Sequence, residues 1–175
     1  GNTQVAGHCR MNRSGKDQIY SGELKQIALK YFDKIKLRPT PDNLDFKYRG
    51  NRFDTIIAGW TKYWNDVLNP DEDLDPNLVK ALIATESGFD IEAKIKAGKK
   101  ADYARGLMQV TDWALEILKD EKGELRDHLI DLDQNDMAEA ELNIAAGLRW
   151  LHRKRETASS KLKRKATWIE AAFKC

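Results

Sequence analysis

The sequence predicts a mainly helical protein that folds as a single globular domain. Apolar residues recur three and four positions apart in several segments, which places them on one face of a helix. No segment shows the strict alternation of a half-buried strand, and no internal repeat is present. Prolines, glycines and short polar residues fall at the ends of the periodic segments, where helices start and stop.

Length and composition agree with one domain. The 175 residues are 41% hydrophobic and 33% charged, and 30 basic against 28 acidic residues leave a net charge of +2. These values exclude a disordered chain and a strong polycation. No apolar run approaches the roughly 18 residues of a membrane-spanning helix. Two cysteines cannot form a disulfide scaffold, and Cys9 and Cys175 could either pair or be unrelated thiols.

The first 73 residues are expected to form a loose arm, residues 1–20, and a helical extension, residues 21–73. A first helix would begin after an N-cap at Ser21 and end before Pro39 and Pro41. Its apolar face is Leu24, Ile27, Ala28, Tyr31 and Ile35. A second, aromatic stripe ends at Asn69-Pro70 and is more typical of a core than of a sugar-binding surface. It consists of Phe53, Ile56, Ile57, Trp60, Tyr63, Trp64, Val67 and Leu68.

The remaining residues, 74–175, predict further helices. Asp75-Pro76 combines an N-cap with proline in the first turn, and Ser87-Gly88 ends that helix. Residues 90–105 are expected to form a loop, with room for a very small hairpin, and residues 120–135 an irregular segment. Thr111 is expected to cap a short helix. Two more apolar stripes predict a long helix and a last one: Met137, Ala140, Ile144, Ala145, Leu148 and Leu151, then Leu162, Ala166, Ile169 and Phe173.

Glu86 lies on the apolar face of its helix, four residues after Leu82 and three after Ile83. Burial disfavours the charged form of a carboxyl group and raises its pKa. A glutamic acid that keeps its proton near neutral pH can act as a general acid. By spacing alone, Glu86 could equally bend out to solvent at the helix end or pair with a nearby cation.

Three motifs in order carry a family resemblance. They are Ala81-Leu82-Ile83-Ala84-Thr85-Glu86-Ser87-Gly88-Phe89, then Gly106-Leu107-Met108-Gln109-Val110-Thr111, and then Asn143-Ile144-Ala145-Ala146-Gly147-Leu148-Arg149-Trp150-Leu151. Together they resemble the catalytic domain of soluble lytic transglycosylases, in the lysozyme-like superfamily that also holds goose-type lysozymes. The resemblance covers residues 74–175 and implies a lysozyme-like fold.

The resemblance implies cleavage of peptidoglycan between N-acetylmuramic acid and N-acetylglucosamine, with Glu86 as acid and base. Glu86 would protonate the leaving oxygen and then accept a proton from the muramoyl 6-hydroxyl, which closes a 1,6-anhydro ring. A second carboxylate is unnecessary because the nucleophile belongs to the substrate. The chain would need no cofactor and no metal. Its place of action would be the periplasm or the cell exterior.

The same resemblance suggests a substrate-binding role for five other residues, each with a structural alternative. Ser87 would hydrogen-bond the acid or an acetamido group, or simply end the helix. Gly106 would let the loop approach the sugar. Met108 would lie against sugar faces or fill the core. Gln109 would bind substrate or hold Glu86, and Asn143 would bond the acid or the sugar, or be satisfied by backbone.

One part of the family pattern is missing. Members usually carry a Tyr-Asn pair after the final helix, and that tyrosine commonly contacts the catalytic acid. Residues 168–175 resemble the approach to this motif. Either the chain stops just short of it, or Phe173 takes the aromatic place without a hydroxyl.

Two rival functions and three surface features remain open. A hydrolase would need a second acid, for which Asp90, Asp102 and Asp112 are nearest in sequence. A non-catalytic glycan-binding module of a secretion or phage apparatus is the other rival. A basic cluster could touch a membrane surface or be a solvated face, but we expect no nucleic-acid partner and a monomer. The cluster comprises Arg153, Lys154, Arg155, Lys161, Lys163, Arg164 and Lys165. A lysine-rich stretch, Lys94, Lys96, Lys99 and Lys100, could attract peptide carboxylates.

Overall fold

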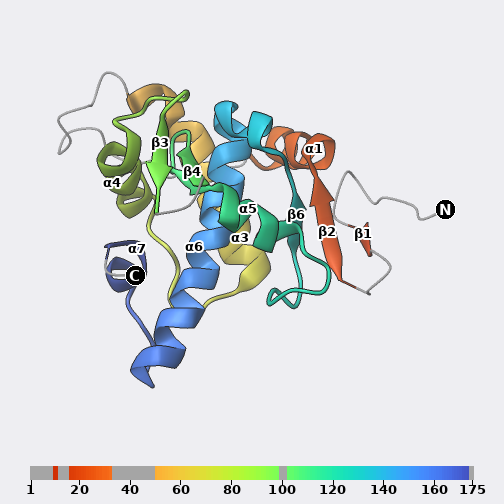
Figure 1. Ribbon diagram of the computed structural model, residues 1–175, viewed down its shortest axis with the longest axis vertical. Helices are drawn as coiled ribbons and strands as arrows, with labels where there is room; N and C mark the ends of the chain where they lie inside the picture. Colours follow the sequence, from red (N-terminus) through yellow and green to blue (C-terminus); the bar gives the residue numbers. More distant parts are fainter. Residues whose placement is uncertain (1–9, 12–15, 33–49, 99–101, 174–175) are drawn as a thin grey trace.

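The computed structural model describes residues 10–11, 16–32, 50–98 and 102–173. Six α-helices and two small three-stranded sheets lie within these ranges, which confirms the prediction of a mainly helical fold. The long helix α6 (Ala140–Leu162) runs through the middle of the molecule (Figure 1). Helices α1 (Ser21–Phe32), α3 (Asp54–Leu68), α5 (Asp112–Lys119) and α7 (Trp168–Phe173) pack on it.

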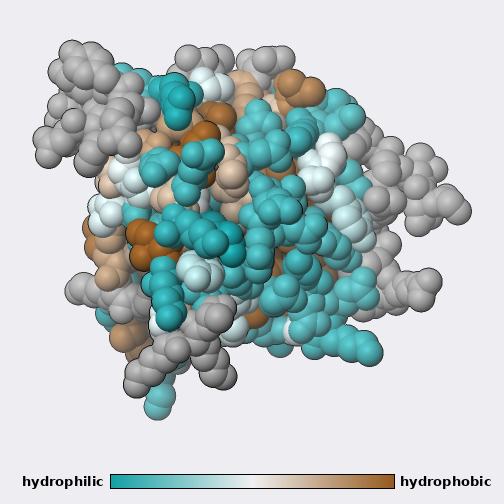
Figure 2. Space-filling model, turned by 45° about the horizontal axis from the view of Figure 1, so that its top comes forward, coloured by the Kyte–Doolittle hydropathy of each residue, from teal (hydrophilic) through white to brown (hydrophobic). Residues whose placement is uncertain are grey.

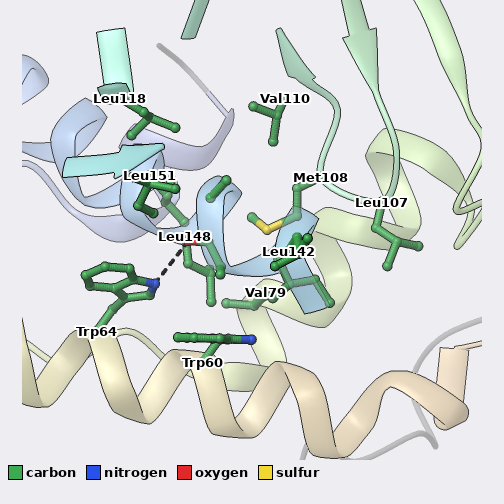
Figure 3. Packing of buried hydrophobic residues seen from close by; sticks show 14 of the residues in the cluster. Trp60, Trp64, Val79, Leu107, Met108, Val110, Leu118, Leu142, Leu148 and Leu151 are labelled. Carbon is green, nitrogen blue, oxygen red and sulfur yellow. Dashed lines mark hydrogen bonds between the residues drawn. The ribbon is translucent and has the colours of Figure 1, made fainter. Parts of the chain in front are cut away.

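The aromatic stripe of α3 belongs to the core, as predicted. Trp60 and Trp64 are fully buried, and Figure 3 shows both indole rings facing the apolar side of α6. The indole nitrogen of Trp64 donates a hydrogen bond to the Ala145 carbonyl at 3.0 Å. Residues of both predicted parts of the chain, such as Leu24 and Leu148, belong to one hydrophobic cluster. The side chains of α1 and α3 therefore complete the core around α6.

The helix α4 (Pro76–Ser87), which carries Glu86, has the predicted ends. The Asp75 carboxylate accepts a hydrogen bond from the Asn77 amide at 2.8 Å and satisfies one of the free N–H groups of the first turn. Gly88 closes the helix in the left-handed conformation at φ 59°, which glycine adopts without strain. Glu86 thus sits in the last turn of α4.

The expectation of a loose arm over residues 1–20 is wrong for residues 17–20, which form a strand. Strand β2 (Asp17–Tyr20) pairs with β1 (Arg10–Met11) and, in parallel, with β6 (Leu129–Asp131). Ile19 is fully buried. The strand was missed because four residues are too few to show a period, and its partner lies more than 100 positions away.

A second sheet replaces half of the predicted middle loop. Strands β3 (Lys94–Ala97) and β4 (Asp102–Arg105) form an antiparallel hairpin, and β5 (Val110–Thr111) adds to β4. The very small hairpin that the sequence allowed is therefore present, and residues 94–97 and 102–105 are not loop. The segment predicted to be irregular, residues 120–135, contains β6 and the start of the 3₁₀ helix η2 (Gln134–Ala138). Both elements were missed in the sequence because the segment is rich in charged residues.

The last helix begins later than predicted. Leu162 is the last residue of α6, and Lys163 caps the helix in the left-handed conformation at φ 56°. Helix α7 then spans only Trp168–Phe173. The cap at Thr111 is confirmed, because its hydroxyl accepts from the Ala114 amide at 3.0 Å. The prolines expected to end the first helix, and both cysteines, lie outside the described residues.

Hydrophilic residues cover most of the face shown in Figure 2, and hydrophobic residues form separate patches between them. Trp113 and Ile169 are among the large hydrophobic side chains with more than half of their surface exposed. Within the described ranges, none of the helices has the length and apolar character needed to span a bilayer.

Candidate functional site

Glu86 faces a cavity of about 140 Å³. Four parts of the chain surround it: the last turns of α4, the segment from Met108 to Thr111, the middle of α6, and α7. The lining residues are Leu82, Glu86, Met108, Gln109, Val110, Thr111, Gly147, Trp150, Leu151, Lys154 and Ala172. The three motifs that are separate in sequence therefore meet at one cavity, and Glu86 supplies its only carboxylate within the described part of the chain.

The Glu86 carboxyl group is partly exposed and partly desolvated by the cavity wall. This burial raises its pKa above the ordinary glutamate value, and the nearby positive charge of Lys154 works in the opposite direction. Among the described residues, Glu86 forms no hydrogen bond and no ion pair. Its environment therefore favours retention of the proton while leaving both oxygens available to a ligand.

Ser87 connects the end of α4 to the neighbouring loop, and no hydrogen bond to Glu86 is among its described contacts. Its hydroxyl lies 2.7 Å from the Leu107 carbonyl and 3.2 Å from the Ile83 carbonyl, so it can donate to either. The expected bond to the acid is absent from the described contacts. The side chain instead fixes how the loop 106–109 approaches Glu86.

Asn143 anchors the same loop from α6. Its Oδ1 accepts from the Met108 amide at 2.8 Å, and its Nδ2 donates to the carbonyls of Arg105 and Met137 at 2.9 and 3.0 Å. The side chain is fully buried. The alternative of an amide satisfied by backbone is therefore the one that the described contacts show, and no hydrogen bond to Glu86 is among them.

Gly106 and Gly147 give this arrangement its close packing. Gly106 has φ +71°, and a Cβ there would lie 2.3 Å from both Asn143 Nδ2 and the Met137 carbonyl. A Cβ at Gly147 would lie 2.5 Å from the Met108 sulfur. Gly106 is buried, so protein atoms, rather than a sugar as expected, exclude a side chain there.

Met108 and Gln109 do reach the cavity. Met108 is 8% exposed, lines the cavity and packs closely against Gly147 of α6. Figure 3 shows its side chain among the buried hydrophobic residues of the core. Gln109 adopts φ +53°, an uncommon value for a residue with a side chain. Its amide donates to the Gly106 carbonyl at 3.0 Å, so it does not hold Glu86 in place. Its position at the cavity leaves it able to meet a ligand.

Sequence reasoning missed two polar or aromatic lining residues on α6, Trp150 and Lys154. They follow Gly147 by three and seven positions, so all three fall on one face of the helix. With Gly147 assigned to the site, that spacing would have predicted that Trp150 and Lys154 line it too. Trp150 also packs edge-on against the exposed Trp113, with ring centroids 5.7 Å apart. These two indoles extend the cavity wall toward α5.

The acids that a hydrolase would need lie elsewhere. Asp112 forms an ion pair with Arg105 at 2.7 Å. Asp90 accepts from the Glu92 amide, and Asp102 accepts from the Trp113 amide. None of the three lines the Glu86 cavity.

Most of the basic cluster is neutralised by acids. Arg153 pairs with Glu124 and Glu156, and Arg164 with Glu170. Arg155 and Lys165 both reach Asp71. This pairing supports a solvated or structural face over an anion-binding one.

One group of side chains in the described part of the chain has metal-ligand geometry. The ligand atoms of Asp17, Asp127 and His128 lie within 4.8 Å of one another. The Asp127 carboxylate already accepts from the amides of Asp17 and His128, both at 2.8 Å, and the guanidinium of Arg149 donates to the carbonyls of Asp127 and His128. These contacts tie β2 to the segment before β6, remote from the Glu86 cavity.

Helix α7 contributes Ala172 to the cavity, while Phe173 is 46% exposed and is not among the lining residues. Phe173 therefore does not take the place of the family tyrosine beside Glu86. The remaining two residues of the chain lie outside the described ranges.

The comparison with family models agrees with this site. The model of the transglycosylase SLT domain matches residues 67–171, more than half of the chain, and the match includes all three motifs and every lining residue but Ala172. A search of the curated proteins and a search of the solved structures gave no match. The helices that bring these motifs to one cavity, and the extent of the match, show that the chain belongs to the transglycosylase SLT domain family.

Proposed function

We propose that this protein is a lytic transglycosylase that cleaves peptidoglycan glycan strands between N-acetylmuramic acid and N-acetylglucosamine. The observation that carries the proposal is that, among the described residues, Glu86 is the only carboxylate lining the cavity. A mechanism with one carboxylate requires an internal nucleophile, and the muramoyl 6-hydroxyl is such a group. Family membership supports peptidoglycan as the substrate.

The reaction uses the Glu86 carboxyl group twice. In the first step its proton passes to the glycosidic oxygen as the bond from that oxygen to the muramoyl C1 breaks. In the second step the O6 hydroxyl bonds to C1, and its proton passes to the Glu86 carboxylate. The 1,6-anhydro end and the free 4-hydroxyl together contain all atoms of the substrate, and Glu86 regains its proton. The raised pKa suits the first step.

The cavity wall suits an amino sugar. Met108, Trp150 and the neighbouring Trp113 offer apolar surface, and Gln109 and Thr111 offer polar groups, a combination typical of ligand pockets. Aromatic side chains with one exposed face are also common at binding surfaces. We place the site of action outside the cytoplasm, where peptidoglycan lies.

Digestion of purified peptidoglycan tests the reaction. Mass spectrometry should find 1,6-anhydro-muramoyl ends; reducing ends alone would identify a hydrolase. Glu86→Gln should abolish the products while binding to sacculi persists. Glu92→Gln is the matched control, because Glu92 is exposed and does not line the cavity. If the unaltered chain binds sacculi and releases nothing, a non-catalytic glycan-binding module is the correct interpretation.

A further inference from the structure

Lys154 shares the cavity with Glu86 and, within the described ranges, is the only other charged residue that lines it. It lies on α6, four positions after Trp150, whereas Glu86 lies on α4. The segment from Met108 to Thr111 and helix α7 contribute only uncharged lining residues within the described ranges. On the helix of Glu86 itself, the buried Lys80 is paired with Asp54 at 2.8 Å and does not line the cavity.

The charge of Lys154 is not used elsewhere in the described structure. Its neighbours Arg153 and Arg155 are held by acids, whereas Lys154 has no hydrogen bond or ion pair among the described residues. Asp90, the acid nearest to Glu86 in sequence, is exposed and accepts from the Glu92 amide. Within the described ranges, Lys154 and Glu86 are therefore the two charged residues that line the cavity, and no hydrogen bond or ion pair joins them.

We infer that Lys154 is a positioning residue for Glu86, whose ammonium stabilises the carboxylate that remains after proton donation. This inference rests on the proposed function. Opposite charges in a partly desolvated cavity attract more strongly than in water. As the glycosidic bond breaks, negative charge develops on Glu86, and Lys154 favours that change without competing for a hydrogen-bonding oxygen.

The arrangement balances two opposing demands on one group. Burial alone would make Glu86 a weak acid that holds its proton too firmly, because the wall of the cavity disfavours the anion. A direct ion pair would remove the proton altogether near neutral pH. A cation held at a distance leaves the pKa of Glu86 raised but less so than burial alone would make it. Glu86 can then both donate and recover a proton within one cycle.

The decisive experiment compares the titration of Glu86 in four chains by ¹³C NMR of labelled glutamate side chains. Lys154→Met removes the charge and keeps most of the length, and its Glu86 should titrate at higher pH than in the unaltered chain. Lys154→Arg should restore the original titration. Lys161→Met is the matched control, an exposed lysine of the same helix that does not line the cavity, and should change nothing.

The enzyme assay gives a second, separate readout. Lys154→Met should move the alkaline limb of kcat/KM to higher pH and lower the plateau several-fold, since a weaker acid transfers its proton more slowly. If the Met variant does not fold, Lys154→Gln replaces it. An unchanged Glu86 titration in the charge-free variant overturns the inference and leaves the proposed function intact. A shifted titration in a chain that forms no anhydro product supports the electrostatic pair and refutes the proposed transglycosylase reaction.

Discussion

Replacing Asn143 with alanine should loosen the loop that carries Met108 and Gln109. The substitution removes three hydrogen bonds of 2.8 to 3.0 Å in a fully buried place. It leaves the Met108 amide and the carbonyls of Arg105 and Met137 without these partners. A buried polar group that loses its partner costs about 1–3 kcal/mol, with carbonyls at the lower end.

The expected loss in the free energy of unfolding is about 3–5 kcal/mol for Asn143→Ala, a large part of the roughly 5–15 kcal/mol typical of a domain. For a chain of this size, the melting temperature should fall by roughly 6–20 °C. Thermal unfolding followed by circular dichroism measures the loss. Hydrogen exchange measures the loop, where the Met108 amide should lose its protection.

Asn135→Ala is the control, because Asn135 is exposed and has no hydrogen-bond partner among the described residues. It should change stability by less than about 0.5 kcal/mol. A loss below about 1 kcal/mol for Asn143→Ala, with the Met108 amide still protected, would refute the anchoring role. Asn143 would then have to be reconsidered as a residue that meets the ligand.

Two further substitutions test the cavity wall and the core beside it. Trp113→Ala removes an indole that is 62% exposed and packs on Trp150, so affinity for N-acetylglucosamine oligomers should fall about three- to tenfold, while stability changes by about 1 kcal/mol or less. Calorimetric titration measures the affinity, and an unchanged Kd contradicts the aromatic wall. His152 is 4% exposed, and burial with the charges of Arg149 and Arg155 lowers its pKa to about 3. In the unfolded chain, His152 takes up a proton near pH 6.5. The stabilising contribution of the buried, neutral His152 is therefore complete above that pH and is lost as the pH falls toward 3. The total is of the order of 5 kcal/mol, from about 1.4 kcal/mol per pH unit between 6.5 and about 3. His152→Leu should flatten the dependence of the urea midpoint between pH 7 and 4; an undiminished slope would show that other groups control acid stability.

Local signals in the sequence predicted the helical elements well. Asp75 and Gly88 cap the two ends of α4 through contacts with residues a few positions away, and Thr111 caps α5 in the same way. The stripe containing Trp60 and Trp64 is long enough to show its period. The strands were missed or left open because two to four residues show no period, and β2 depends on a partner more than 100 positions along the chain.

The site divides in the same way. Glu86, Met108 and Gln109, to which the resemblance assigned roles, all line the cavity. Ser87 and Asn143 instead hydrogen-bond the backbone of the loop, and Gly106 allows the loop to pack closely against Asn143. No spacing rule distinguishes a residue that binds a ligand from one that supports its neighbour. Both kinds occur in the same motifs.

The sequence by itself determined that the protein is helical, that Glu86 ends an apolar helix face, and that three ordered motifs mark a transglycosylase-like domain. These properties depend on neighbours one or two turns away, where backbone geometry relates spacing to direction. Only the tertiary structure decided that Lys154 lines the same cavity as Glu86, that Asp90, Asp102 and Asp112 do not line it, and how Asn143 holds the loop. Such contacts join elements far apart in the chain, and their distances follow from how α4 and α6 pack against the shared core.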